Sequence, residues 1–339
     1  MTEHATATTP EPQQDKFGPI NRGYDAVFQR GRLSVGLVVP ITAYPVARLP
    51  DMAGQVQKIQ QAEALGFSAV WLRDVPFDVP SFGDAGQVYD PFVYLGLLAG
   101  QTRTIALGVA SLILPLRHPA HVAKAAASVD VLSGGRLILG IASGDRPDEY
   151  PALGIPFHER GQRFRESFDY IRHMSPTAAA FENGFGRSPG GIDLLPKPTA
   201  ESLPMLVTGG SQQDPAWIAE HADGWIVYPR EPLSQRTLVH EWRGRVEDAG
   251  RSPKPVMQPL YIDLADDSDT PPTPIHLGMR LGMKRLIDYV QTLETAGINH
   301  LALNLRFNRA DIGATLQRLS EELLPHFTDP TTRNTETPR

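Results

Sequence analysis

The segment 104–144 constrains the fold most, because it predicts a strand, a helix and a second strand in close succession. Apolar runs at 105–114 and 136–142 indicate buried strands, and Ser133, Gly134 and Gly135 end the helix between them. A continuous apolar strand, a helix and another such strand are typical of a parallel βαβ unit. Both strands finish in small residues, which leave a shallow space for a planar group at the carboxyl edge of the sheet.

The same alternation continues along the chain. Further strands are expected at 33–40, 67–74, 204–209, 223–229, 256–265 and 300–307. Helices are expected at about 51–66, 90–101, 118–133, 159–173, 214–222, 233–249, 279–296 and 311–327. We expect Asp51 to cap the first helix, and Pro259 to interrupt its strand by a bulge or a later start. Eight alternating strands and helices predict an α/β protein with a single-domain (β/α)₈ TIM barrel.

The barrel is expected to span residues 31–327. Residues 1–30 are predicted to be a disordered lead because their first part is polar and rich in Pro, Thr and Gln, and residues 328–339 a loose tail. Residues 176–203 form a weakly patterned connection. Loops at 75–88, 145–158 and 266–279 are the candidates for a lid over the site, because they contain Gly and Pro.

Composition excludes several partners. A formal net charge of −6 gives no basic stripe for nucleic acid. No apolar run reaches the length of a membrane helix, and the N-terminus carries no signal-peptide pattern, so we expect a cytoplasmic protein that does not enter a membrane. The absence of cysteine rules out disulfides, thiolate nucleophiles and thiolate metal sites.

The predicted strand ends also exclude several chemistries. No lysine ends a strand, so a Schiff-base mechanism lacks its nucleophile. No His/His/carboxylate cluster appears, so no metal site is expected. Asp74 and Asp263 end strands, but these strands lie far apart around a barrel, which disfavours the paired carboxylates of a glycosidase. With few reactive groups and several small ones, the chemistry is expected to belong to a bound cofactor.

The sequence TGGSQQDPAW at 208–217 is a candidate phosphate anchor. Gly209 and Gly210 let backbone amides converge, Ser211 adds a hydroxyl, and the following helix directs its positive end at the anion. A plain strand–helix turn with Asp214 as the N-cap explains the same spacing equally well.

Four segments match one known family. The run RHPAHVAKAAASVDVLSGGRLILGIASG at 117–144, supported by the segments at 62–74, 148–172 and 208–225, resembles the signature of luciferase-like monooxygenases. These are flavin-dependent (β/α)₈ enzymes related to bacterial luciferase. The resemblance covers roughly residues 31–327.

The resemblance implies a set of FMN-binding residues. It implies a non-prolyl cis peptide at Ala110–Ser111 under the flavin ring, and it places Ser143 beside the ring, where bacterial luciferase has an arginine. Ser211 coincides with a serine that holds the FMN phosphate. Gly209, Gly210 and Gln212 belong to the same cofactor-binding turn. Arg160 or Arg163 supplies a cationic partner for the phosphate, and we expect Arg163 to take this role.

One departure from the family concerns catalysis. Bacterial luciferase has a catalytic histidine after its second strand, where this chain has Asp74. Asp74 is therefore one catalytic candidate, with an Arg73–Asp74 ion pair at the barrel mouth as the alternative. His118 is the second candidate, and capping or packing of its helix explains it equally well. Trp71 is expected to fill the core.

Three functions remain open. The first is an FMN-dependent monooxygenase or oxidoreductase acting on a small organic substrate, with reduced flavin supplied by a separate reductase. The second is a deazaflavin-dependent hydride-transfer enzyme of the same superfamily. The third is a flavin-binding protein without catalysis. The resemblance also implies a homodimer that pairs through helices of the barrel.

Overall fold

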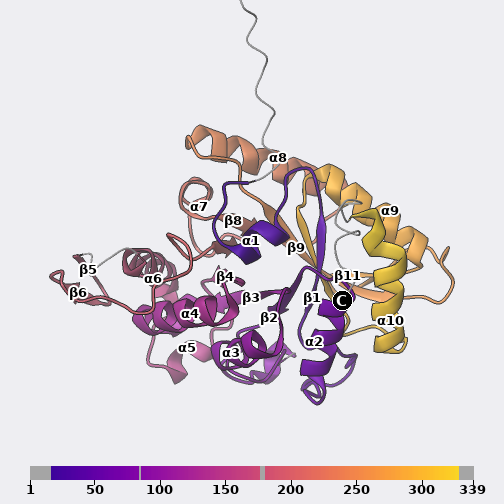
Figure 1. Cartoon of the computed structure of the whole chain (residues 1–339), viewed down its shortest axis with the longest axis horizontal. Helices are drawn as coiled ribbons and strands as arrows, with labels where there is room; N and C mark the ends of the chain where they lie inside the picture. Colours follow the sequence, from indigo (N-terminus) through magenta and orange to yellow (C-terminus); the bar gives the residue numbers. More distant parts are fainter. Residues whose placement is uncertain (1–16, 84, 176–179, 328–339) are drawn as a thin grey trace, which may run out of the picture.

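The computed structural model describes residues 17–83, 85–175 and 180–327 (Figure 1). Most of the predicted lead, up to residue 16, and the predicted tail at 328–339 lie outside this range. No helix in the described ranges is long and apolar enough to cross a membrane.

Eight parallel strands close into a barrel, as predicted. The sheet closes because β8 pairs with β9, and because β12 joins β9 to β1. The strands are β1 (Ser34–Val38), β2 (Ala69–Leu72), β3 (Ala106–Ile113), β4 (Leu137–Ala142), β7 (Met205–Thr208), β8 (Gly224–Ile226), β9 (Val256–Leu264) and β12 (His300–Asn304).

Helices surround this barrel (Figure 1). They are α2 (Gln55–Ala64), α3 (Pro91–Gln101), α4 (Pro119–Ser133), α6 (Arg160–Met174), α7 (Pro215–His221), α8 (Pro232–Asp248), α9 (Met283–Ala296) and α10 (Ile312–Arg318). Short additions were not predicted: α5 (Glu149–Ala152), a hairpin of β5 (Phe181–Asn183) and β6 (Gly186–Ser188), and a second hairpin of β10 (Thr273–Ile275) and β11 (Gly278–Leu281).

Two helix starts differ from the prediction. Asp51 does not cap a helix, because α2 begins at Gln55 after Gly54, whose φ of 68° is left-handed. The Asp51 side chain instead accepts a hydrogen bond from the nearby amide of Ala53. The segment from residue 279 continues as β11, and helix α9 begins only at Met283.

Pro259 does not interrupt its strand. It lies within continuous β9, opposite Ala302 of β12. On the other edge of β9, β8 pairs only as far as Met257 and β11 pairs only from Tyr261. Pro259 lies in the gap between these two partners, so its missing N–H removes no hydrogen bond between strands. This explains why proline is tolerated in a barrel strand.

A short helix inside the predicted disordered lead closes the amino-terminal end of the barrel. Helix α1 (Arg22–Val27) is capped by Asn21, whose side chain accepts from the Tyr24 amide and donates to Asp130 and to the Leu137 carbonyl. Tyr24 and Val27 pack with apolar residues of the barrel interior. The folded part of the chain therefore begins before residue 31.

A polar chain runs through the barrel interior below the strand ends. The Trp71 indole N–H donates to His300 Nε2 over 2.8 Å, and His300 Nδ1 lies 2.7 Å from the Ser34 hydroxyl. Because Ser34 donates its own proton to the Val27 carbonyl, it accepts from Nδ1–H, which makes the imidazole neutral. Complete burial lowers the pKa of His300 to about 3. Trp71 fills the core, as predicted.

Candidate active site

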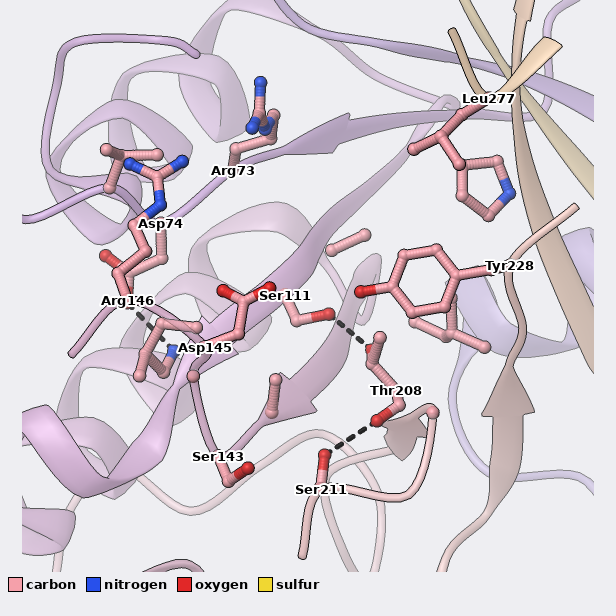
Figure 2. Close-up of a pocket in the computed structure, with 18 of the residues that line it drawn as sticks. Arg73, Asp74, Ser111, Ser143, Asp145, Arg146, Thr208, Ser211, Tyr228 and Leu277 are labelled. Carbon is pink, nitrogen blue, oxygen red and sulfur yellow. Dashed lines mark hydrogen bonds between the residues drawn. The ribbon is translucent and has the colours of Figure 1, made fainter. Parts of the chain in front are cut away.

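A cavity of about 910 Å³ lies at the carboxyl ends of the strands (Figure 2). Its floor and walls come from the ends of β3, β4, β7, β8 and β12. The three loops predicted as lids each contribute lining residues, among them Phe82, Phe157 and Leu277. This is the end of a barrel at which active sites are found.

The predicted cis peptide at Ala110–Ser111 is present. It coincides with a shift in the β3–β4 register between Val109 and Leu112. The Ser111 hydroxyl hydrogen-bonds the Thr208 hydroxyl of β7, so the end of β3 is linked to the strand that precedes the candidate phosphate anchor (Figure 2). The small side chains of Ala110 and Ser111 line the cavity, as expected for a surface that faces a planar group.

Ser143 and Gly144 form the end of β4 at the cavity. Ser143 is buried, and its carbonyl accepts a hydrogen bond from the Tyr150 hydroxyl. Gly144 has a φ of 75°, and a Cβ there would lie 2.7 Å from Ile113 Cγ2 and 2.9 Å from the Tyr150 hydroxyl. The close approach of Tyr150 therefore requires glycine at this position, and burial raises the pKa of Tyr150 to about 12.

The turn 209–212 after β7 has an unusual backbone. Gly209, Ser211 and Gln212 have left-handed φ values of 54°, 42° and 59°. Ser211 Oγ donates to the Thr208 carbonyl over 2.7 Å. Among the described residues, no intramolecular acceptor is found for the amides of residues 210–212. Successive free N–H groups in left-handed turns form concavities that bind anions.

The first turn of α6 holds this anchor in place. Gln213 Nε2 donates to the Gly161 carbonyl over 2.8 Å and to the Ser211 carbonyl over 3.1 Å. Gly161 allows close approach, because a Cβ there would lie 2.9 Å from Gln212 Cβ. The helix after the turn, α7, contributes less to anion binding than predicted. It has only seven residues, and the Ala216 amide in its first turn already donates to the Asp214 carboxylate.

The arginine beside the anchor is Arg160, not Arg163. Arg160 lines the cavity, and its guanidinium lies 3.8 Å from the centroid of the Phe157 ring. Its Nη1 donates to the Phe157 carbonyl over 3.0 Å, whereas its buried Nε has no hydrogen-bond partner. Arg163 points elsewhere: it donates to the Pro115 carbonyl and stacks on Phe185. The two residues are three apart on one helix, so the sequence alone could not separate them.

Comparison with known proteins identifies the family. The sequence profile described as luciferase-like monooxygenase matches residues 32–270. The chain belongs to the luciferase-like monooxygenase family. Members of this family and their structural neighbours are flavin- or F420-dependent oxidoreductases, and the chain is an enzyme of this broad type.

Curated relatives of this luciferase-like protein include two mycobacterial proteins. An uncharacterized protein of Mycobacterium bovis is 29% identical over 219 residues, which cover 60% of this chain and 75% of that protein. The F420-dependent hydroxymycolic acid dehydrogenase of Mycobacterium tuberculosis is 29% identical over 223 residues, or 65% of this chain and 59% of that protein.

Solved structures share the barrel. The monooxygenase RslO1 from Streptomyces bottropensis superposes with a TM-score of 0.72 at 18% identity, covering 87% of this chain and 100% of that chain. An F420-dependent secondary alcohol dehydrogenase, bound to an F420–acetone adduct, gives 0.72 at 16% identity, covering 88% and 100%. The oxygenating constituent of 3,6-diketocamphane monooxygenase from Pseudomonas putida, in complex with FMN, gives 0.69 at 15% identity, covering 88% and 100%.

In this luciferase-like chain, Asp74 takes an arginine partner other than the one predicted. Its buried carboxylate accepts from Arg117 at 2.8 and 3.1 Å and from the Ile113 amide at 3.0 Å. Arg117 also pairs with Asp90. The predicted partner Arg73 lines the cavity separately. Both oxygens of Asp74 are engaged in hydrogen bonds. The geometry therefore favours a structural ion pair that fixes the end of β3, and it does not favour a catalytic role for this carboxylate.

His118 lies outside the cavity lining. Its Nδ1 accepts from the Ala120 amide over 3.3 Å at the start of α4, and its ring packs edge-on against Tyr170 and Phe185. His118 therefore caps and packs its helix, which is the alternative stated above. These contacts give no support to a catalytic role for His118.

Two further groups, Glu149 and Tyr228, lie in the cavity wall. Glu149, on α5, is 2% exposed, and burial raises the pKa of its carboxyl despite Arg146, whose Nη1 lies 3.9 Å away. Tyr228, which follows β8, directs its hydroxyl toward Ser111 (Figure 2). Burial and then the nearby Asp145 carboxylate raise the pKa of Tyr228, which keeps the hydroxyl protonated.

Proposed function

We propose that this chain is an FMN-dependent luciferase-type oxidoreductase or monooxygenase that acts on a small organic substrate. One observation supports this proposal. The 209–212 turn, with its free amides, and Arg160, with its unpaired Nε, line the same cavity as the Ala110–Ser111 peptide. The free donors suit a phosphate, and the small residues at the ends of β3 and β4 suit a flat ring.

The cavity residues would bind two different parts of FMN. Ser211 and the 210–212 amides would bind the phosphate together with Arg160, while Ala110, Ser111 and Ser143 would face the ring. The bound flavin supplies the redox chemistry. The protonated Tyr228 hydroxyl is a hydrogen-bond donor at the same surface, and the three loops at the mouth would limit access of water to the site.

The test is a parallel titration of the cofactor-free protein with FMN and with coenzyme F420. The proposal expects FMN to bind more tightly. Oxygen uptake with chemically reduced FMN, with and without a flavin reductase, then separates an oxidoreductase from a flavin-binding protein without catalysis. Absence of FMN binding refutes the proposed cofactor.

A second candidate is F420-dependent hydride transfer. It is favoured by the named relative from Mycobacterium tuberculosis, which is an F420-dependent dehydrogenase at 29% identity. Both cofactors carry a phosphate and a planar ring system, so the anchor suits either. Tighter binding of F420 in the parallel titration would select this candidate.

We also propose a homodimer that forms through α3 and α4, which pack against each other. Val93 and Leu97, one turn apart on α3, are 74% and 49% exposed, and Leu132 on α4 is 70% exposed. Light scattering tests this proposal: the wild type should have the mass of a dimer, and Val93→Glu that of a monomer. A monomeric wild type would refute it.

A further inference from the structure

The backbone is strained at Leu277, in the wall of the cavity. Leu277 has a left-handed φ of 47°, which a bulky side chain rarely adopts. Among the described residues, two others that are not glycine have a left-handed φ, Ser211 and Gln212. All three line the same cavity. Strained residues of this kind cluster at functional sites. Ser211 and Gln212 belong to the proposed phosphate anchor, which leaves the strain at Leu277 to be explained.

Leu277 lies in the two-residue turn of the β10–β11 hairpin. Ile275 pairs with Gly278, so His276 and Leu277 are the turn residues. Turns of this length usually have Gly, Asn or Asp at a left-handed position. The glycine of this hairpin stands one position later, at Gly278, where a Cβ would lie 1.8 Å from the Tyr261 carbonyl oxygen of β9. A leucine therefore occupies the position at which glycine would relieve the strain.

The Leu277 side chain contributes little to the packing of the hairpin. It is 41% exposed and belongs to neither apolar cluster of the described core. The turn is held by its backbone, because the Leu277 carbonyl accepts from the Tyr261 amide over 3.3 Å and β11 pairs with β9 from Gly278 onward. The strain therefore serves the position of the side chain at the cavity.

Leu277 faces the proposed cofactor residues across the cavity. Figure 2 shows it on the side opposite Ser143 and Ser211. The half-buried rings of Tyr261 and Phe307, whose centroids lie 5.3 Å apart, line the cavity beside the hairpin. This side of the cavity therefore presents hydrocarbon surface to a molecule that lies between the hairpin and the cofactor.

We propose that Leu277 determines substrate specificity by packing against a hydrocarbon part of the substrate, so that the substrate class is one with an apolar body. The substrate would bury the exposed surface of the leucine, and this burial would favour binding. The inference rests on the proposed function, because it assigns the opposite side of the cavity to the cofactor.

The probes are phenol and 2-naphthol, which differ by one fused hydrocarbon ring, titrated by calorimetry into FMN-saturated protein. The wild type should bind 2-naphthol about tenfold or more tightly than phenol, because the second ring buries further apolar surface. Leu277→Gly and Leu277→Asn should each reduce this preference several-fold. Glycine and asparagine both suit a left-handed backbone, so the urea concentration at the midpoint of unfolding should stay equal or rise.

Leu153→Gly is the matched control, because Leu153 is 42% exposed, has an ordinary φ of −106° and lies outside the cavity lining. It should lower the urea midpoint, as glycine does where the backbone is not strained, and keep the preference for 2-naphthol. Equal binding of the two probes to the wild type, or a preference that survives both Leu277 substitutions, would overturn the inference. A lower urea midpoint in both Leu277 variants would also overturn it, because the leucine would then be a packing residue of the hairpin.

The same titration on cofactor-free protein separates this inference from the proposed function. If FMN does not bind while the preference for 2-naphthol depends on Leu277, the cofactor assignment fails and the role of Leu277 stands. If FMN binds and the preference does not depend on Leu277, the role of Leu277 alone is wrong.

Discussion

The buried His300 makes the stability of the barrel depend on pH. In the folded chain its Nε2 accepts the Trp71 N–H, and its Nδ1–H faces Ser34, so a second ring proton would meet a donor. The folded pKa of His300 is lowered to about 3, whereas an unfolded histidine titrates near about 6.5. The unfolded chain therefore binds the proton first as the pH falls. The free energy of unfolding should decrease by about 1.4 kcal/mol per pH unit below about pH 6.5.

The perturbation is His300→Gln, which replaces the ring with an amide that does not titrate. Urea denaturation at several pH values between 6.5 and 4.5 measures the free energy of unfolding of both proteins. Because carboxylates contribute to both curves, the informative quantity is the difference between the two free energies of unfolding. This difference should change by about 2 kcal/mol over this range. His158→Gln, at a side chain that is 85% exposed, is the control and should follow the wild type. Parallel curves for the wild type and His300→Gln would refute the reasoning.

Two substitutions test the packing that shapes the site, each by urea denaturation. Arg117→Gln leaves the buried Asp74 carboxylate without its cation and should cost about 3 kcal/mol, so a loss below about 1 kcal/mol would show that the pair is not structural. Gly108→Ala places a Cβ 2.2 Å from the Trp71 ring and should cost about 1–3 kcal/mol. Gly100 lies in the exposed last turn of α3, and a Cβ there would meet nothing within 4 Å. Gly100→Ala should therefore be neutral or stabilising, and equal effects at both glycines would contradict this account.

The barrel was predictable because its strands are buried on both faces and therefore appear as uninterrupted apolar runs. Helix α1 was not predictable in the same way, because its few apolar residues follow a polar segment and become buried only when the barrel end is present to receive them. The β10–β11 hairpin was missed for a similar reason. Its pairing with β9 depends on a neighbouring edge that local periodicity does not reveal.

The site could be predicted only in part. The Ala110–Ser111 cis peptide followed from the family resemblance and not from the residue types. The choice between Arg160 and Arg163 depends on which face of α6 meets the 209–212 turn. The partner of Asp74, Arg117, lies 43 residues away on another segment. Such long-range pairings are set by tertiary packing, which local sequence patterns do not reveal.

The 209–212 turn and Arg160 are proposed to bind a flavin phosphate. The most direct measurement compares the affinities of FMN and riboflavin, which differ only by that phosphate, in the wild type and in Arg160→Gln, Ser211→Ala and Arg163→Gln. The wild type should prefer FMN by about tenfold or more, and both the Arg160 and the Ser211 substitution should reduce that preference while leaving riboflavin binding intact. Arg163→Gln should behave as the wild type. An FMN preference that survives Arg160→Gln and disappears in Arg163→Gln would contradict the account.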